Sequence, residues 1–283
     1  MAKYNKKKKK HPILRKIGQY SLLILVTIFM IGPFLWLLAT ALKSGNENIF
    51  QYPPTFIPSD PTFSNFGKVL ETFPFFRYLF NSIVVGFLTV FLNVLFCSLA
   101  AYPLARMKFR GSKTIFILII STMMIPFQLL MIPVYIISLN LGLQNTYLGM
   151  VLPHITTAFG VFLMRQAFLT IPEELDESAR MDGANSFQIW WRILMPLAKP
   201  SMVTLMIFTF VSAWGDFLWP LIIINDQSMY TLPLGLNMLS GTFTSDWRLI
   251  AAGTILSMLP ILIVFLLLQK FFIGGAMKGA VKG

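Results

Sequence analysis

The sequence predicts an all-α membrane protein with six transmembrane helices, and its composition and charge spacing carry that prediction. Hydrophobic residues make up 56% of the 283 residues and charged residues only 12%, against about 25% charged residues in soluble globular proteins. The mean hydropathy is +0.71. Long uncharged stretches, each long enough to cross a membrane, separate the charges. This composition excludes a disordered chain, a disulfide scaffold and most soluble enzymes.

Five almost uncharged stretches define the spans, namely residues 17–42, 78–105, 114–164, 200–225 (interrupted by Asp216) and 249–269. A span needs about 20 residues, whereas the third stretch has 51 and as one helix would be about 77 Å long. We therefore expect it to fold back at the polar break 140–146. The six predicted spans are 18–42, 78–103, 114–138, 148–169, 201–224 and 249–272.

Every predicted span contains a proline, which removes a helical hydrogen bond and favours a kink. The prolines are Pro33, Pro103, Pro126, Pro133, Pro153, Pro220 and Pro260. In a membrane such sites persist where neighbouring helices satisfy the freed backbone groups. The pattern therefore predicts a packed bundle of bent helices.

The net charge of +12 is explained by membrane topology. The N-terminal segment, the loops 104–113 and 165–199 and the C-terminal tail together carry 19 of the 23 Lys and Arg residues. Basic residues favour the cytoplasmic side, so we expect both termini in the cytoplasm. The run Lys6–Lys10 is interpreted as a topology anchor rather than a nucleic-acid or lipid site. The predicted domains are a basic tail, 1–16, and a transmembrane domain, 17–283.

A cleaved signal peptide is a rival for the first span, because Ala39-Thr40-Ala41 has the small-x-small form of a cleavage site. The apolar run before it exceeds the 7–15 residues or so of a signal peptide core, so we expect a retained helix. Cys97 is the only cysteine, and His11 and His154 are not spaced as a ligand pair. We therefore expect no disulfide, no zinc site and no cofactor held by this chain.

The polar segment 170–200 stands apart, because it holds five of the eleven acidic residues. Thr170 with Glu173 fits a capping box for a first helix that runs to about residue 181. Gly183 suits a left-handed stop, and Asn185 or Ser186 suits the cap of a second helix that Pro196 and Pro200 end. One face of the first helix carries mostly small side chains, suited to close docking on a partner: Leu175, Ser178, Ala179 and Asp182. A hairpin lying on lipid is the alternative, which the acidic residues disfavour.

This segment closely resembles the cytoplasmic EAA motif of binding-protein-dependent ABC importer permeases. The motif has Glu-Ala-Ala, three residues, Gly, nine residues and Ile-x-Leu-Pro, and the chain has Glu177-Ser178-Ala179, Gly183 and Ile193-Leu194-Met195-Pro196 at that spacing. Ser178 and Met195 are its two departures. The resemblance implies a type I ABC importer (MetI-like) transmembrane domain. It also implies that the segment couples to an ATPase through Glu177, Ser178, Ala179, Arg180, Asp182, Gly183, Ile193 and Pro196, with Glu177 and Gly183 as the main residues.

Further stretches are similar to the carbohydrate branch of that family. They are residues 182–184, 197–200 and 214–220, and the tail 279–283, which is similar to that of the MalG-type member of a permease pair. The resemblance implies a multi-pass protein of the bacterial plasma membrane that imports a sugar or oligosaccharide. The implied partners are a second permease in a heterodimer, two ATPase subunits, an extracytoplasmic substrate-binding protein and membrane lipid, with no nucleic acid. The chain has no P-loop, so it is expected not to be an enzyme, with ATP and Mg on the ATPase subunits.

Asp216 is the one acidic residue inside a predicted span, and intramembrane ionisable groups are candidates for function. Trp214 and Trp219 lie close by in the sequence and are able to stack on a sugar ring. We therefore name these three residues as a candidate substrate path, with a purely structural role as the alternative. The resemblance implies that the outer segments 43–77 and 225–247 face the binding protein, with ordinary solvated loops as the alternative. Ser64 is expected to cap a short helix in the first of them.

Other functions stay open at this point. An ABC permease for glycerol-phosphate, a polyamine or an amino acid has the same coupling segment. An ion-coupled transporter usually shows several intramembrane charges and an internal repeat, whereas this chain has one such acidic residue and no repeat evident by eye. A membrane enzyme would need clustered His, Asp or Cys near one membrane face, which the sequence lacks.

Overall fold

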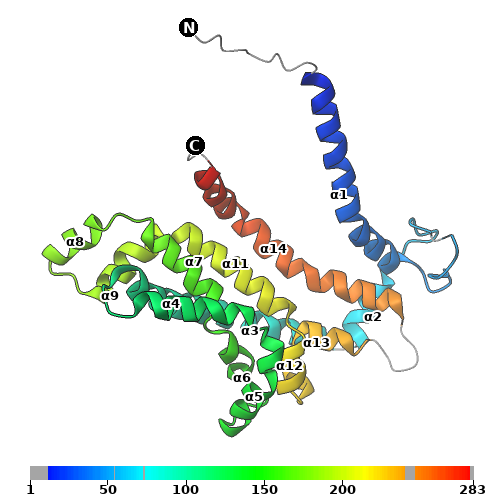
Figure 1. Cartoon of the computed structure of the whole chain (residues 1–283). Helices are drawn as coiled ribbons and strands as arrows, with labels where there is room; N and C mark the ends of the chain where they lie inside the picture. Colours follow the sequence, from blue (N-terminus) through cyan, green and yellow to red (C-terminus); the bar gives the residue numbers. More distant parts are fainter. Residues whose placement is uncertain (1–11, 54, 73, 240–245, 281–283) are drawn as a thin grey trace.

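The computed structural model describes residues 12–53, 55–72, 74–239 and 246–280, and these form helices joined by turns (Figure 1). Within that part of the chain the one β-type pairing is an isolated bridge between Lys43 and Pro61. The all-α class predicted from composition is therefore confirmed. The run Lys6–Lys10, Phe73, Thr242 and the end of the tail lie outside the described residues.

The helices follow one another along the chain without domain-sized insertions. The α-helices are α1 (Pro12–Leu42), α2 (Ser64–Thr72), α3 (Phe75–Arg106), α4 (Ser112–Ser121), α5 (Phe127–Asn140), α6 (Tyr147–Val151), α7 (Ala158–Leu169), α8 (Glu174–Met181), α9 (Ser186–Ile189), α10 (Met195–Leu197), α11 (Lys199–Gly215), α12 (Leu218–Ile223), α13 (Leu232–Asn237) and α14 (Trp247–Ala280). Short turns of other helical types are η1 (Thr122–Met124), η2 (Leu152–His154), the π-helical η3 (Trp190–Leu194) and η4 (Gln227–Met229).

Three of the six predicted spans are continuous helices long and apolar enough to cross a membrane, within α1, α3 and α14. The other three are not single unbroken helices over 114–138, 148–169 and 201–224, and the total reaches the predicted six when each bent pair counts as one span. The first bends by 102° between η1 and α5, and the second by 55° between η2 and α7. The third breaks between α11 and α12 at Asp216 and Phe217.

Proline alone does not decide where these helices break. Pro33, Pro103, Pro133 and Pro260 all lie inside continuous helices. Pro126 sits at the 102° bend with extended backbone, ψ 138°. At the other two breaks a polar side chain satisfies the freed amides, because Thr157 accepts a hydrogen bond from the Gly160 amide and Asp216 from the Trp219 amide. These two breaks therefore differ from the positions where a helix continues through a proline, because a side chain at each break accepts a backbone hydrogen bond.

The bundle is built around α3, which packs against α7 and α11 (Figure 1). The core along these helices includes Cys97, Met164 and Leu205, each at most 1% exposed. Small residues allow the close approach of α7 to α3, since a Cβ on Gly160 would lie 2.6 Å from the Cys97 sulfur. The central helix therefore has little freedom to move independently of α7 and α11.

Helix α1 differs from the rest of the bundle, because its side chains from Ile17 to Leu35 are nearly all exposed and apolar. It packs on α14 only over part of its length, and the two helices diverge toward the termini (Figure 1). Between them lies an apolar cavity of about 390 Å³, lined by Phe34, Leu38, Met258 and Leu262 among others. A helix that is apolar all round is suited to lipid or to the apolar surface of another chain.

On the side of the bundle opposite α8, buried asparagines join separate elements. The Asn65 amide donates to the carbonyls of Ala41 and Lys43, at 2.8 Å each, and so attaches α2 to the end of α1. Asn81 is fully buried and donates to the carbonyls of Ser228 and Tyr230, both at 2.9 Å. Each of these bonds replaces a hydrogen bond to water that the polar group loses when it is buried.

The packing of α13 on α3 gives a stability prediction. A Cβ on the buried Gly235 would lie 2.1 Å from the Tyr78 ring, so Gly235→Ala is expected to destabilise the protein by about 1–3 kcal/mol through overpacking. Gly67→Ala is the matched control, because that glycine is also helical but has nothing within 4 Å of the added carbon. Thermal unfolding of detergent-solubilised protein should show a lower midpoint for Gly235→Ala alone. Equal midpoints for both variants would contradict the close contact.

Candidate functional site

The polar segment forms the helical hairpin that its sequence predicts. Helix α8 runs to Met181, Gly183 adopts the left-handed region with φ +83°, and α9 begins at Ser186. Asn185 caps α9 in a full capping box, because its side chain accepts from the Gln188 amide at 2.9 Å and Gln188 accepts from the Asn185 amide at 2.8 Å. The predicted glycine stop is confirmed, and of the two candidate caps, Asn185 and Ser186, the structure uses Asn185.

One local prediction about this hairpin is wrong. The Thr170 hydroxyl donates to the Ala167 carbonyl at the end of α7, 2.8 Å away, so it does not form a capping box with Glu173. Helix α8 begins after Glu173 without a side-chain cap. The second limb ends at Leu197, between Pro196 and Pro200 as predicted, and an 81° bend separates it from α11. The turn before this bend, η3, is π-helical, because the Met195 amide donates to the Trp190 carbonyl. The wider hydrogen-bond spacing of a π-turn accommodates the N–H that Pro196 lacks.

The hairpin is held to the bundle by a buried ion pair between Arg106, the last residue of α3, and Asp176 in α8. The Arg106 Nε lies 3.1 Å from the Asp176 Oδ2, with side-chain exposures of 3% and 9%. Arg106 also donates through Nη2 to the Ile171 carbonyl at 2.7 Å. Burial raises the pKa of the Asp176 carboxyl, and the Arg106 guanidinium opposes that shift. Sequence reasoning missed the pair, because nothing local joins residues so far apart in the chain.

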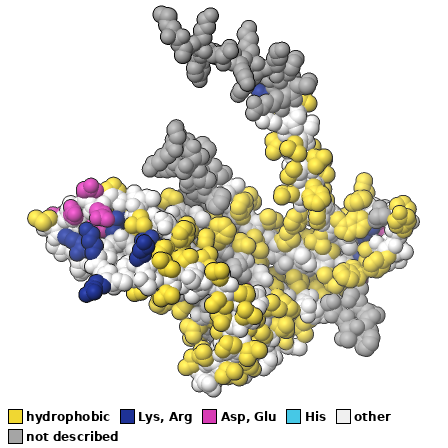
Figure 2. All heavy atoms as spheres, viewed as in Figure 1, with side chains coloured by type: hydrophobic (Ala, Val, Ile, Leu, Met, Phe, Trp, Pro, Cys, Tyr) yellow, Lys and Arg dark blue, Asp and Glu magenta, His cyan; other side chains and the backbone are white. Residues whose placement is uncertain are grey.

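Most predicted coupling residues lie on the free surface of the hairpin. Glu177, Ser178, Arg180, Asp182, Gly183 and Pro196 are exposed, and Ala179 and Ile193 are half-buried. Figure 2 shows acidic and basic side chains gathered at this end of the molecule, while hydrophobic side chains cover most of the rest of that face. Apolar side chains are exposed among the charges, with Met181 at 89% and Phe187 at 63%. The hairpin therefore offers a mixed charged and apolar surface.

The inner side of the second limb is packed into the bundle core. Ile189, Trp190 and Leu194 are at most 1% exposed and join the cluster formed by α3, α7 and α11. The hairpin follows α7 after a short turn and leads into α11 through Ala198. A displacement of the hairpin therefore displaces both helices, because no flexible linker separates them.

A second polar cluster lies within the spans, where Asp216 meets His154. The Asp216 Oδ2 is 3.4 Å from the His154 Nε2, and Oδ1 accepts from the Trp219 amide at 3.3 Å. A small cavity of about 60 Å³ beside them is lined by hydroxyl groups of Thr89, Thr157, Thr209 and Ser212. Asp216 thus contacts the His154 imidazole and also caps the helix that follows it. The described residues include no group of three His, Cys, Asp or Glu able to hold a metal.

The three helix breaks meet at this cluster. Phe127, the first residue after the break at Pro126, packs its ring 5.1 Å from that of His154 and 5.8 Å from that of Trp219. Asn93 of α3 lies behind them, donating to the His154 carbonyl at 2.8 Å and accepting from the Thr209 hydroxyl at 3.2 Å. In Figure 1 the outer pieces α5, α6 and α12 project together from the bundle. The cluster joins them to the inner helices.

The two tryptophans beside Asp216 are not available for stacking in this conformation. Trp214 is 2% exposed and donates to the Ser257 carbonyl at 3.0 Å, and Trp219 is fully buried and donates to the Gly149 carbonyl at 2.9 Å. Both indoles act here as anchors between helices, and neither lies at an exposed interface belt, where the structural alternative places them. Of the three candidate path residues, Asp216 alone is partly exposed.

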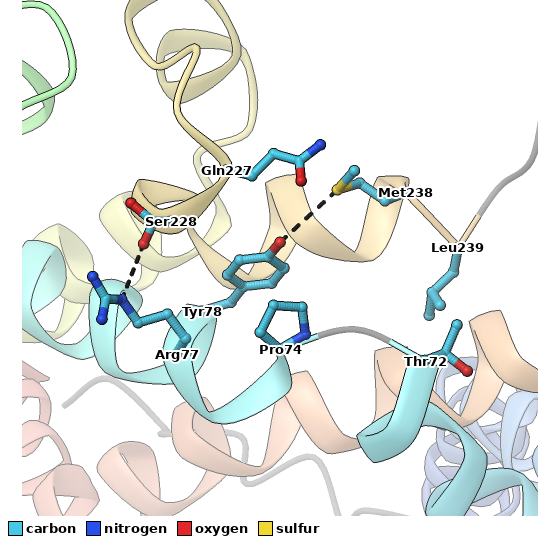
Figure 3. Close-up of a pocket in the computed structure, with 8 residues that line it drawn as sticks. All are labelled: Thr72, Pro74, Arg77, Tyr78, Gln227, Ser228, Met238 and Leu239. Carbon is cyan, nitrogen blue, oxygen red and sulfur yellow. Dashed lines mark hydrogen bonds between the residues drawn. The ribbon is translucent and has the colours of Figure 1, made fainter.

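At the end of the bundle away from the hairpin, a pocket of about 550 Å³ opens between α3, η4 and α13 (Figure 3). Arg77 donates from Nε to the Ser228 carbonyl at 3.1 Å, and the Tyr78 hydroxyl points toward the Met238 sulfur. The Ser228 amide donates to Asp226, and hydrogen bonds from Ser228 hold the pKa of that carboxyl below its usual range. The pocket combines one exposed guanidinium with an amide and an aromatic ring.

Bent apolar helices, a charged helical hairpin at one end and a polar cluster inside the spans define a multi-pass membrane permease. The family model of the binding-protein-dependent transport system inner membrane component matches residues 93–275. The chain therefore belongs to this family, whose members are permease subunits of ABC importers.

Two relatives and one solved structure show the extent of the likeness. The chain is 39% identical over 209 residues to the arabinooligosaccharides transport system permease protein AraQ of Bacillus subtilis (strain 168), covering 74% of each chain. It is 32% identical over 262 residues to the sn-glycerol-3-phosphate transport system permease protein UgpE of Yersinia enterocolitica, covering 90% of this chain and 93% of the relative. A bacterial ABC transporter involved in the import of the acidic polysaccharide alginate matches with a TM-score of 0.79 and 27% identity, over 92% and 96% of the two chains.

The geometry of Asp216 gives a prediction that distinguishes a role in the substrate path from a purely structural role. Asp216→Asn keeps an oxygen that accepts from the Trp219 amide but removes the negative charge opposite His154. If Asp216 lies on the substrate path, uptake into cells is expected to fall while the amount of protein in the membrane stays unchanged. Ser21→Ala, on the exposed surface of α1, serves as the control and should keep normal uptake. Wild-type uptake by Asp216→Asn would remove this residue from the path.

Proposed function

We propose that this chain is one of two permease subunits of an ATP-driven importer for a sugar or oligosaccharide. In this proposal it spans the bacterial plasma membrane with both termini in the cytoplasm and forms the path with a second, different permease. Two ATPase subunits bind ATP and Mg on the cytoplasmic side, and a substrate-binding protein delivers the solute from outside. The family supports the transport role, and the name of the AraQ relative, an arabinooligosaccharides permease, supports the class of solute.

The observation that carries the proposal is the exposed charged hairpin fixed to the helices on either side of it. Closure of the ATPase pair on ATP would move the hairpin, and the hairpin would move α7 and α11 with it. Rigid-body movement of packed helices is a common means of switching between two states. The polar cluster at the three helix breaks is then exposed to one side of the membrane at a time.

Within the hairpin the side chains have separate roles. Glu177 is expected to pair with a basic residue in the ATPase cleft, with Arg180 and Asp182 in support. Gly183 provides the left-handed turn that lets the two limbs fold back. Ser178 and Ala179 are small enough to let the backbone of α8 approach the cleft closely, and Ile193 and Pro196 shape the second limb.

The outer face supports delivery by a binding protein. The pocket around Arg77 and Tyr78 lies at the end of the bundle opposite the hairpin (Figures 1 and 3). Its exposed guanidinium suits an acidic side chain of a docked protein. The outer segments 43–77 and 225–247 border this pocket through α2 and η4.

A glycerol-phosphate is the second candidate solute, because one relative is named for its transport. The charge inventory favours a neutral solute over it. The uncharged stretches that form the spans contain no Lys or Arg, and the one histidine in them, His154, is paired with Asp216. A phosphate passing this subunit would therefore meet a carboxylate without a free cation, which is unfavourable in a low-dielectric site.

Co-purification tests the proposed assembly. Extraction of the tagged chain from its native membrane is expected to yield a complex with a second permease and two copies of an ATPase. Reconstituted into liposomes with its binding protein, that complex should take up sugar only when ATP is present on the cytoplasmic side. A chain that purifies alone and transports without ATP would contradict the proposal.

The left-handed turn gives a sharper prediction. Gly183→Asp should abolish uptake while leaving membrane insertion intact, because a side chain is strained at φ +83° and the turn is where the hairpin meets its partner. Gly111→Asp is the matched control, since Gly111 is also exposed and has φ +89° but lies outside the hairpin. Uptake by that control should be close to wild type. Normal uptake by Gly183→Asp would rule out the coupling role.

A further inference from the structure

The buried ion pair at the base of the hairpin connects it to a third helix, α3, which is not adjacent to it in the sequence. Arg106 belongs to α3 and Asp176 to α8, and their charged atoms lie 3.1 Å apart with almost no exposure. The 2.7 Å bond from Arg106 to the Ile171 carbonyl adds a second contact on the segment that leads into α8. The Arg106 guanidinium therefore contacts both α8 and the segment that leads into it.

A reciprocal contact runs from the neighbouring helix back to α3. Arg165 of α7 donates from Nε to the Leu104 carbonyl at 3.0 Å, and its guanidinium lies 4.1 Å from the centre of the Phe116 ring. The end of α3 is therefore bonded in both directions, to the hairpin through Arg106 and to α7 through Arg165.

These contacts differ in kind from the apolar packing around them. Apolar contacts have no preferred direction, whereas the ion pair holds two opposite charges together and the hydrogen bonds from Arg106 and Arg165 to backbone carbonyls have a preferred length and direction. A buried ion pair gains little net stability, because desolvation offsets attraction, but losing one partner leaves an uncompensated buried charge. The pair therefore resists separation of α8 from α3 more than it stabilises the fold.

The far part of α3 reaches the polar cluster inside the spans. Asn93 bonds to the His154 carbonyl and to the Thr209 hydroxyl, and His154 pairs with Asp216. A shift of α3 along its axis would therefore move an anchor shared by α7 and α11 at the level of the helix breaks. The contacts form a continuous physical route from the hairpin surface to that cluster.

We propose that Arg106 and Asp176 are positioning residues that transmit the movement of the hairpin to α3, so that ATP-driven closure reaches the intramembrane cluster through α3 as well as through α7 and α11. This inference rests on the proposed function. Neither residue touches the ATPase or the solute in this scheme. They convert hairpin movement into helix movement.

The test uses the complete importer reconstituted in liposomes with its binding protein. Asp176→Asn and Arg106→Gln each remove one charge of the pair, and both uptake and ATP hydrolysis are measured. The expected result is a fall of about tenfold in solute taken up per ATP hydrolysed, within the usual range of coupling energies, with hydrolysis itself within about twofold of wild type. Glu174→Gln and Lys108→Gln are the matched controls, since both are exposed charges beside the pair.

The charge swap Arg106→Asp with Asp176→Arg separates positioning from general damage. Partial recovery of the uptake-to-hydrolysis ratio in the double variant, relative to each reversed single variant, is expected if the pair acts as a unit. Where a neutralised variant does not assemble, Asp176→Glu and Arg106→Lys keep the charges but change their reach, and they should still lower the ratio. A wild-type ratio in all assembled single variants would overturn the inference. Absence of ATP-driven uptake by the wild-type complex would instead refute the proposed function.

Discussion

Within lipid, every backbone amide and carbonyl needs a hydrogen-bond partner in the protein. This requirement governs where these helices can break. Two breaks solve it with a local acceptor, the Thr157 hydroxyl and the Asp216 carboxylate, and the third with Pro126, which has no amide to satisfy. Each solution introduces polar atoms that are themselves costly in lipid. Several of these polar groups contact one another, since Asn93 donates to the His154 carbonyl and the Asp216 carboxylate lies 3.4 Å from the His154 imidazole. The polar cluster and the bent helices are thus one solution to one constraint.

The hairpin is free of this requirement, because water can hydrogen-bond to the polar groups on its outer side. Its charges are spread over an exposed surface, and the one buried carboxylate in it, Asp176, is paired with Arg106. The two polar regions of the molecule therefore lie at the surface end and at the interior breaks of the same helices. Since α3, α7 and α11 are packed together over their length, neither region can rearrange without strain in the other.

The sequence predicts the class, the spans and the hairpin because these depend on short-range signals. Uncharged length marks a span, and a glycine followed by Asn185 marks a turn with a helix after it. The sequence predicts that the helices bend but not where, since Pro33 and Pro260 lie in continuous helices while Pro126 lies at a 102° bend, and neighbours far along the chain make the difference. The Thr170 hydroxyl had two possible partners within four residues, and only the fold decides between them. The pairing of Arg106 with Asp176 is likewise a product of tertiary contact.

The exposed apolar surface of α1 has a consequence for how the protein is made. A helix without a polar face has no need of neighbours to remain in a bilayer, so α1 can leave the insertion machinery and rest among lipid tails before any partner chain is present. The wedge between α1 and α14 would at that stage be filled by acyl chains. In the proposed assembly a partner chain would replace lipid along this wedge. Membrane thickness and lipid composition would thereby act on the yield of complete complexes rather than on the folding of this chain.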